Sequence, residues 1–354
     1  MNIRSILLLL CLVFSCDVFP ASKYAIPATD EGLPGAGPIR RYEWFQNLWD
    51  RKRSGWAKLV QQDQGALVFL GDSITQGWGD TMGGSFPGVK VANRGISGDT
   101  TRGVLIRLRE DVLLLNPSGV VLLIGTNDLE EKATPEVIAD NLKLIIAVLK
   151  KHSADMPIIL CNVMPSSAAK KRPADQIKKI NQLYFAAVKG DAQVTMLDTW
   201  LLFADDKGDA KKPEFPDLLH PNKTGYAKWA AALRPLLATH GFVETKPDTF
   251  HLEPGYMSLF NGHDLTGWGF RAKKTFKPTF TFDGKKASND ARYVAINGRL
   301  VVTTPPEGRR VQQLWTTREF PENFILRLEF RATPNADSGV FIRKPQLQCR
   351  DYVL

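Results

Sequence analysis

The sequence predicts an α/β protein, a three-layer α/β/α sandwich with a five-stranded parallel sheet, followed by a C-terminal all-β domain. Three observations lead to this prediction. Short, continuous apolar runs alternate with amphipathic helical segments between residues 66 and 237, which is typical of a parallel sheet covered on both faces. After residue 241 the helical periodicity gives way to short strand-like segments. A chain of 354 residues is also long enough for two domains.

The first 21 residues have the form of a secretory signal peptide. Arg4 precedes an almost wholly apolar stretch at residues 6–14, which is too short to span a membrane. We therefore expect a secreted or periplasmic protein with no membrane-spanning segment. A stretch that loosely resembles a lipoprotein cleavage box precedes Cys16, so anchoring through Cys16 is the less favoured alternative. Residues 22–40, rich in Pro, Gly and Ala, are predicted to form a linker.

Residues 41–63 open the predicted α/β domain, which extends over residues 41–240. Trp44 with Leu48, and Phe45 with Trp49, are spaced four apart, as in an amphipathic helix that lies against the following domain. Gly55 is expected to break this helix into two pieces.

The alternating elements of the sheet follow in order. Strands are predicted at residues 66–70, 90–93, 119–125, 157–163 and 194–197, and helices at residues 100–115, 135–152, 173–188 and 222–233. Thr134 and Pro135 are typical of a helix cap and a first helical turn. The last helix is expected to stop before Pro235.

Residues 241–256 are predicted to form a second linker, and residues 257–354 a partial β domain. Strands are expected at residues 293–296, 300–302, 324–330 and 339–342. Asn297-Gly298, between the first two, is a strong tight-turn signal. In the third, apolar and charged residues alternate strictly from residue 326.

The net charge of +9 does not point to a nucleic-acid partner. Basic residues are scattered among acidic ones, and the short basic runs at residues 51–53 and 170–172 are interpreted as solvated helix faces or loops. The cysteine spacing is not that of a metal site or a disulfide framework, and Cys161 is interpreted as a buried small hydrophobe.

Ser73 is the candidate nucleophile. The first apolar run ends in Gly71-Asp72-Ser73, which places the serine at the carboxyl end of a strand, where ligands bind in open α/β sheets. His220 is the candidate base and Asp217, three residues earlier, the candidate acid that orients it. The alternatives are a helix cap for the serine, a surface position for the histidine and a turn role for the aspartate.

Donors for an oxyanion are predicted from two further loops. Gly98 lies in a glycine-containing loop after the second strand, where backbone N–H groups can approach a ligand closely. Asn127 follows the third strand and offers a side-chain amide. A tight turn and a helix cap are the alternatives for these two residues. Because the four segments follow successive strands or lie in the last loop, we expect them to converge on one edge of the sheet.

These segments resemble the four blocks of the SGNH (GDSL) hydrolase superfamily. The matching residues are Gly71-Asp72-Ser73, Gly98, Gly125-Thr126-Asn127-Asp128 and Asp217-Leu218-Leu219-His220. The resemblance implies Ser73 as nucleophile, His220 as base and Asp217 as its partner. Oxyanion donors would be the Ser73 and Gly98 backbones and the Asn127 side chain, and no metal or organic cofactor is implied. Residues 71–78 and 93–101 look nearest to the platelet-activating-factor acetylhydrolase-like branch, which acts on short acyl esters.

The C-terminal region resembles a second family. Residues 259–268, 297–300 and 337–343 look like parts of the 3-keto-disaccharide hydrolase domain, a concanavalin-like, jelly-roll-like β-sandwich. Asp337 stands where asparagine is commoner in that family. The sequence stops at Leu354, short of a whole sandwich, so we expect a truncated domain. No catalytic residue is assigned there, and Trp268 is expected in the core rather than stacked on a sugar.

Together these patterns predict a secreted serine esterase that acts on a small-molecule or polysaccharide ester, above all an acetylated carbohydrate. The C-terminal domain is a candidate for glycan binding. A lipid-directed esterase or lysophospholipase using the same triad is the first alternative. The second is a carbohydrate-binding or glycoside-hydrolysing protein in which the β domain dominates, and the intact set of Ser73, Asn127, Asp217 and His220 argues against it.

Overall fold

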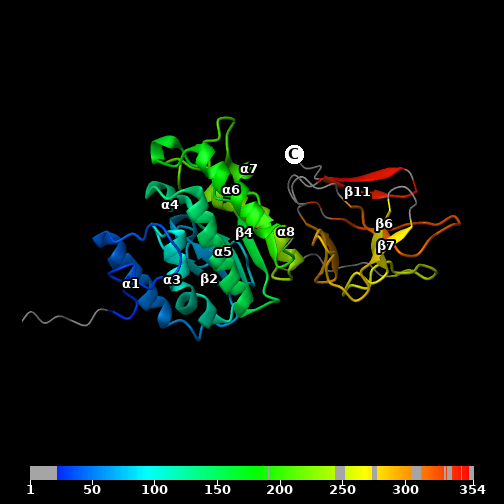
Figure 1. Ribbon diagram of the computed structural model, residues 1–354, viewed down its shortest axis with the longest axis horizontal. Coiled ribbons are helices and arrows are strands. Elements are labelled where there is room, and N and C mark those ends of the chain that lie inside the picture. The colour runs from blue at the N-terminus through cyan, green and yellow to red at the C-terminus, as the bar shows by residue number, and fades with distance from the viewer. Residues whose placement is uncertain are drawn as a thin grey trace, which may run out of the picture.

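The computed structural model describes residues 22–189, 191–243, 252–272, 277–303, 312–330, 332, 337–343 and 345–350. The predicted signal peptide at residues 1–21, with Cys16, lies outside the described residues. The N-terminal part is an α/β sandwich, and the C-terminal part consists of antiparallel strands (Figure 1). The predicted fold class is therefore confirmed.

Five parallel strands form the central sheet in the order β2-β1-β3-β4-β5. They are β1 (Leu67–Gly71), β2 (Val91–Gly95), β3 (Gly119–Leu123), β4 (Ile158–Cys161) and β5 (Val194–Leu197). Every residue of β1, β3 and β4 is buried, because helices cover both faces of the sheet. Cys161 is one of these buried residues, as predicted.

Successive side chains of β1 point into two different cores. Val68 and Leu70 pack with α3 (Thr101–Asp111), α5 (Pro135–His152) and α6 (Ala174–Val188) on one face. Leu67 and Phe69 pack with α8 (Lys223–Thr239) on the other. Three short helices follow strands directly at their carboxyl ends: α2 (Ser73–Gln76), α4 (Thr126–Glu130) and α7 (Thr199–Phe203). The carboxyl edge of the sheet is thus built from tight strand-to-helix turns.

Helix α1 (Glu43–Ala57) packs beside the carboxyl edge through Phe45, Trp49 and Trp56, which form a small core with Ile96. The expected break at Gly55 is wrong, because the helix continues through this residue. A glycine inside a helix costs only about 1 kcal/mol relative to alanine. The buried tryptophans on either side of it outweigh that cost.

The expected end of the last helix is also wrong, because α8 runs through Pro235 to Thr239. Proline removes one helical hydrogen bond, but Leu236 and Leu237 beyond it are buried in the core, and their packing holds the chain helical. The helix predicted at residues 100–115 ends earlier, at residue 111. A 3₁₀ turn follows it at Leu113–Leu115.

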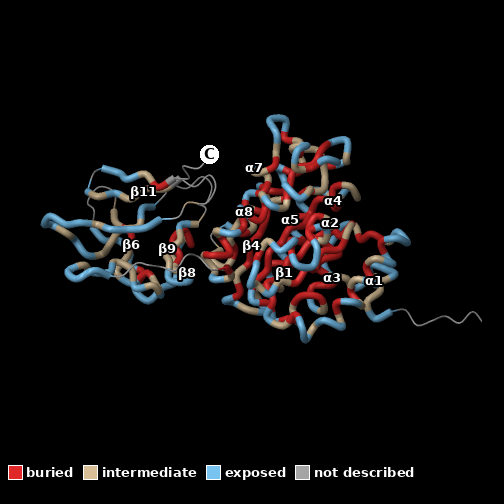
Figure 2. The backbone as a smooth tube through the Cα atoms, turned by 180° about the vertical axis from the view of Figure 1, so that it is seen from behind, coloured by how far each residue is buried: buried red, intermediate tan, exposed pale blue. Residues whose placement is uncertain are grey.

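The C-terminal part contains β6 (Trp268–Arg271), β7 (Pro278–Thr281), β8 (Tyr293–Ile296), β9 (Arg299–Val302), β10 (Trp315–Thr316), β11 (Asp337–Phe341) and β12 (Gln346–Arg350). They form a β10-β6-β7 sheet and the antiparallel pairs β8-β9 and β11-β12. Figure 2 shows that buried residues gather in the α/β sandwich, whereas the β part is mostly exposed or intermediate.

The β8–β9 turn is the predicted Asn297-Gly298, and both residues have positive φ, +44° and +73°. The strand expected at residues 324–330 is wrong, because this segment has no regular structure. Alternation gives a strand two faces, but the backbone also needs a neighbouring strand for its N–H and C=O groups. None of the described strands pairs with it, and Phe324 and Ile325 are exposed.

Residues 22–40 contain no helix or strand, yet part of this segment lies against the sandwich. Asn141 on α5 exchanges two hydrogen bonds with the backbone of Ala36, at 2.8 and 3.0 Å, and Arg102 donates to the carbonyl oxygen of Gly37 at 2.8 Å. The domain boundaries themselves stay a prediction. None of the helices in the described part of the chain combines the length and the apolar character that a membrane crossing requires.

Candidate active site

Ser73 begins helix α2 directly after β1, at the carboxyl edge of the sheet. Asp72 caps this helix, its Oδ1 accepting a hydrogen bond from a backbone N–H at 2.9 Å. The tight turn depends on two glycines. A Cβ on Gly71 would lie 2.3 Å from a carbonyl oxygen of β3, and one on Gly95 would lie 2.3 Å from the backbone nitrogen of Gln76. Only glycine at both positions lets α2 sit this close to the sheet.

The structure brings Ser73, His220 and Asp217 together in one hydrogen-bonded chain. His220 Nε2 lies 3.0 Å from Ser73 Oγ, and His220 Nδ1 lies 2.7 Å from Asp217 Oδ2. Partial burial alone would raise the pKa of Asp217, but the hydrogen bonds from the His220 backbone and imidazole outweigh it and lower the pKa to about 2. Asp217 is therefore ionised and can only accept. His220 Nδ1 must therefore be the donor in this pair, and a neutral imidazole with its proton on Nδ1 can accept from the serine hydroxyl at Nε2.

The loop that carries Asp217 and His220 is held at several points. Asp217 Oδ1 accepts from the backbone N–H groups of residues 219 and 220, at 3.0 and 2.7 Å. Leu218 has φ +62°, which non-glycine residues rarely adopt, and its carbonyl oxygen accepts from Ser166 Oγ at 2.8 Å. Asn222 caps α8 and donates to the carbonyl oxygen of Pro213 at 2.7 Å. These contacts fix His220 and Asp217, the candidate base and its partner, relative to α8.

Gly98 and Asn127 follow β2 and β3 at the same edge as Ser73. Gly98 has φ +87°, and Asn127 lies in the first turn of α4. Asn127 Nδ2 donates one hydrogen to the carbonyl oxygen of Asp99 at 3.0 Å, and its Oδ1 accepts from Arg172 Nη2 at 2.9 Å. This fixes the amide and leaves its second hydrogen for another acceptor. Among the described residues, the backbone N–H groups of Ser73 and Gly98 have no acceptor either.

A buried polar network holds the glycine loop on the sheet. Arg107 Nε donates to Asp99 Oδ2 at 2.8 Å, and both side chains are fully buried. Arg107 Nη2 also donates to the carbonyl oxygens of residues 71 and 94, at the ends of β1 and β2. Thr101 Oγ1 donates to Asp128 Oδ1 at 2.6 Å. Burial raises the pKa of Asp99 and of Asp128 to about 6, and both serve as structural acceptors.

Sequence reasoning missed the contacts of three side chains, Arg172 and Gln76 next to the candidate site and Arg53 on α1. Arg172 and Arg53 lie in runs interpreted as solvated, and this interpretation is wrong for both. They are buried because Arg172 binds Asn127 and Arg53 binds Asp111 across 58 positions of sequence. No local pattern indicates such long-range pairs. Gln76 Oε1 accepts from the backbone N–H of Ser97 at 2.9 Å. Its position in the turn after β1 is the one feature of the sequence that could have indicated a role near the site.

The arrangement can activate a serine hydroxyl. As Oγ attacks a carbonyl carbon, the imidazole can take its proton while the carboxylate stabilises the positive ring. In the described part of the chain, no group of three or more His, Cys, Asp or Glu side chains is placed to hold a metal ion. The absence of a cofactor stays a prediction.

Two family matches coincide with the two parts of the chain. Residues 69–228 match the sequence model of the GDSL-like lipase/acylhydrolase family. Residues 255–353 match the 3-keto-alpha-glucoside-1,2-lyase-like domain. Both resemblances inferred from the motifs are therefore confirmed.

Individual relatives cover the α/β part. The chain is 30% identical to platelet-activating factor acetylhydrolase IB subunit alpha2 of Homo sapiens over 220 residues, which make up 60% of this chain and 89% of that protein. It is 28% identical over 178 residues to subunit alpha1 of Pongo abelii, covering 48% of this chain and 74% of that protein. A solved structure from Streptococcus pneumonia, provisionally described as a platelet activating factor, has a TM-score of 0.51 at 24% identity, covering 55% of this chain and 94% of that chain. This structural likeness concerns the fold.

Proposed function

Since the chain belongs to the GDSL-like lipase/acylhydrolase family and is an ester-bond hydrolase, we propose that it is a serine esterase that removes short acyl groups, above all acetyl, from a carbohydrate. The observation that carries the proposal is the hydrogen-bonded chain from Ser73 through His220 to Asp217. The predicted signal peptide leads us to propose further that it acts outside the cytoplasm.

In the first half of the proposed reaction, Ser73 Oγ bonds to the ester carbonyl carbon and its proton passes to His220 Nε2. Asp217 stays ionised and stabilises the imidazolium through Nδ1–H. The carbonyl oxygen becomes an oxyanion, which accepts from the N–H groups of Ser73 and Gly98 and from Asn127 Nδ2. The tetrahedral intermediate collapses, His220 gives the proton to the leaving alcohol, and an acyl-enzyme remains on Ser73.

The second half repeats the same transfers with water. His220 takes a proton from water as the water oxygen attacks the acyl carbon, and the same donors hold the second oxyanion. When the intermediate collapses, the proton returns to Ser73 Oγ and the acid leaves. Ser73, His220, the leaving alcohol and water account for every proton transfer in the two halves of the reaction.

The substrate class has two supports. The curated relatives are named acetylhydrolases, which favours a small acyl group here. The second domain matches a 3-keto-alpha-glucoside-1,2-lyase-like family, which favours a carbohydrate as the alcohol part and glycan binding by that domain. The name of the relatives also supports a second candidate, an esterase that acts on platelet-activating factor or another lipid ester.

Hydrolysis of 4-nitrophenyl acetate, butyrate and octanoate by wild type and Ser73→Ala tests the proposal. We expect wild-type rates to fall steeply with acyl length, and Ser73→Ala to lose activity while its thermal unfolding stays near that of wild type. Full activity of Ser73→Ala would refute the mechanism. Wild-type rates on acetylated xylan and on platelet-activating factor, measured side by side, separate the two candidate substrate classes.

A further inference from the structure

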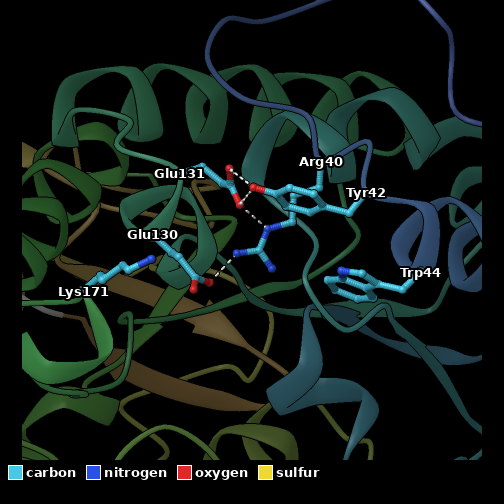
Figure 3. A pocket seen from close by; sticks show the side chains of 6 residues that line it. All are labelled: Arg40, Tyr42, Trp44, Glu130, Glu131 and Lys171. Carbon is cyan, nitrogen blue, oxygen red and sulfur yellow. Dashed lines mark hydrogen bonds and ion pairs between the residues drawn. The ribbon is translucent and has the colours of Figure 1, made fainter.

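A pocket of about 290 Å³ is lined in part by Arg40 and Trp44 (Figure 3), two side chains that lie against Gly98. Its volume lies near the lower end of the range of about 300–1,000 Å³ that is common for small-molecule sites. Its walls come from the start of α1, the end of α4 and the segment after β4. The residues that line it are Arg40, Tyr42, Trp44, Glu130, Glu131 and Lys171. We propose that this pocket is a subsite for the sugar part of the ester substrate, an inference that rests on the function proposed above.

Side chains that line the pocket also contact the residues that hold the candidate oxyanion donors. A Cβ on Gly98 would lie 2.7 Å from Trp44 Cη2 and 2.9 Å from Arg40 Nη1, so these two side chains lie against the loop. On the opposite wall, Arg172 Nη2 donates at 2.9 Å both to Asn127 Oδ1 and to Glu130 Oε2. The pocket therefore lies close to the place where the carbonyl oxygen of a substrate would be held.

The size of the two substrate halves decides which half fills it. An acetyl group has no atoms beyond its methyl carbon, so it cannot occupy a pocket of about 290 Å³ next to the reacting carbonyl. The alcohol half of the ester is the part large enough to do so.

The lining favours a neutral ligand that carries many hydroxyl groups. Tyr42 and Trp44 are each about half exposed, and their rings are stacked with centroids 6.4 Å apart and planes 9° apart. Parallel rings offer flat faces against which the C–H side of a sugar ring can pack. Carboxylates on one wall accept hydrogen bonds from hydroxyl groups, and the basic side chains donate to them.

The charges argue against other ligands. Arg40 pairs with Glu130 and donates to Glu131 Oε1 at 2.7 Å, and Lys171 points toward Glu130 in Figure 3. An anionic ligand would face the two carboxylates, and a cationic one would face the two basic groups. An acyl chain would have to cover these charges without replacing their hydrogen bonds. A sugar can satisfy both kinds of group at once.

A selectivity ratio tests the subsite. The ratio compares kcat/KM for an acetylated xylo-oligosaccharide with kcat/KM for 4-nitrophenyl acetate, which carries no sugar. We expect Tyr42→Ala to lower this ratio about tenfold, equivalent to about 1.4 kcal/mol, through loss of the ring face. Tyr42→Phe keeps the ring and removes only the hydroxyl that donates to Glu131 Oε2 at 3.3 Å, so it should retain most of the wild-type ratio. Leu144→Ala, which truncates an exposed side chain on α5 away from the pocket, is the matched control.

A binding measurement separates the subsite from catalysis. Calorimetric titration of Ser73→Ala with the unacetylated xylo-oligosaccharide should give measurable binding, which the further change Tyr42→Ala weakens about tenfold. Equal oligosaccharide binding with and without the Tyr42 ring overturns the subsite. A wild-type selectivity ratio in Tyr42→Ala also overturns it, and so does an equal fall of this ratio in Leu144→Ala. If Tyr42→Ala lowers kcat/KM only for platelet-activating factor, the sugar subsite is also overturned, in favour of a site for a lipid ester. Wild type that cleaves neither ester refutes the proposed function instead, while the titration still decides the subsite.

Discussion

The proposed role of Asn127 as an oxyanion donor leads to a quantitative prediction for Asn127→Ala. The side chain uses one Nδ2 hydrogen on the Asp99 carbonyl and its Oδ1 on Arg172, at 3.0 and 2.9 Å, so the second hydrogen is held in a fixed direction. A donor fixed in this way costs no reorganisation as charge develops on the substrate oxygen. Its loss should therefore act mainly on the transition state.

The magnitude follows from these contacts. Removal of one oxyanion donor lowers kcat by about 10²–10³, or about 2.7–4 kcal/mol. The two buried hydrogen bonds that Asn127 makes in the free enzyme contribute about 1 kcal/mol each, so the variant should also lose about 2 kcal/mol of folding free energy. Because the ground-state ester makes a weaker bond to the amide than the oxyanion does, KM should change little.

The assay measures kcat and KM for 4-nitrophenyl acetate well below the unfolding temperature of the variant, with urea denaturation to record its stability. A folded Asn127→Ala enzyme with a wild-type kcat would refute the assignment of the donor. A loss confined to KM would also contradict it, since it would place the amide in ground-state binding rather than at the oxyanion.

Three further predictions concern neighbouring residues. Asp217→Asn should lower kcat by about 10⁴ because His220 loses the partner that fixes its tautomer. The lowered pKa of this exposed carboxylate contributes its full stability above the unfolded pKa of 3.8, and the contribution is lost as pH falls to the folded pKa of about 2. After screening by solvent we expect Asp217→Asn to lose at most about 1 kcal/mol of folding free energy at pH 7, which urea denaturation measures. Gly98→Ala should lower kcat, because its Cβ would lie 2.7 Å from Trp44 Cη2 and φ +87° is strained for alanine; wild-type kinetics would contradict the role of this loop. Burial raises the pKa of Asp72 from 3.8 to about 7. Between these pH values the folded protein keeps a proton on Asp72 that the unfolded chain releases, so the contribution of Asp72 to the free energy of unfolding falls as pH rises. Asp72→Asn should remove this part of the pH dependence, which amounts to at most about 4 kcal/mol between the two pKa values. Urea denaturation at several pH values tests this.

The central sheet and the candidate triad were predictable because their signals are local. Buried strands appear as apolar runs, and the carboxyl ends of parallel strands share one edge, so Ser73 and Asn127 had to lie near each other. His220 and Asp217 are three residues apart, and a short loop can place one on the other. The structure has all of them at the same edge.

The errors arose where tertiary contacts decide the structure. Pro235 does not stop α8, since the residues beyond it are buried, and a sequence pattern does not report that burial. Arg172 reads as one member of a basic run, but its partners lie 45 and 42 positions away. The alternation in residues 324–330 specifies two faces without specifying a partner strand. In each case the missing information was a contact or burial that depends on residues far away in the sequence.

The most direct test of the account is the mass of the protein after rapid acid quenching during turnover of 4-nitrophenyl acetate, followed by peptide mapping. The mechanism predicts a species heavier by one acetyl group, with the acetyl ester on Ser73, and its absence in Ser73→Ala. Acetylation of another residue on the catalytic time scale, with Ser73 unmodified, would contradict the central claim that Ser73 is the nucleophile.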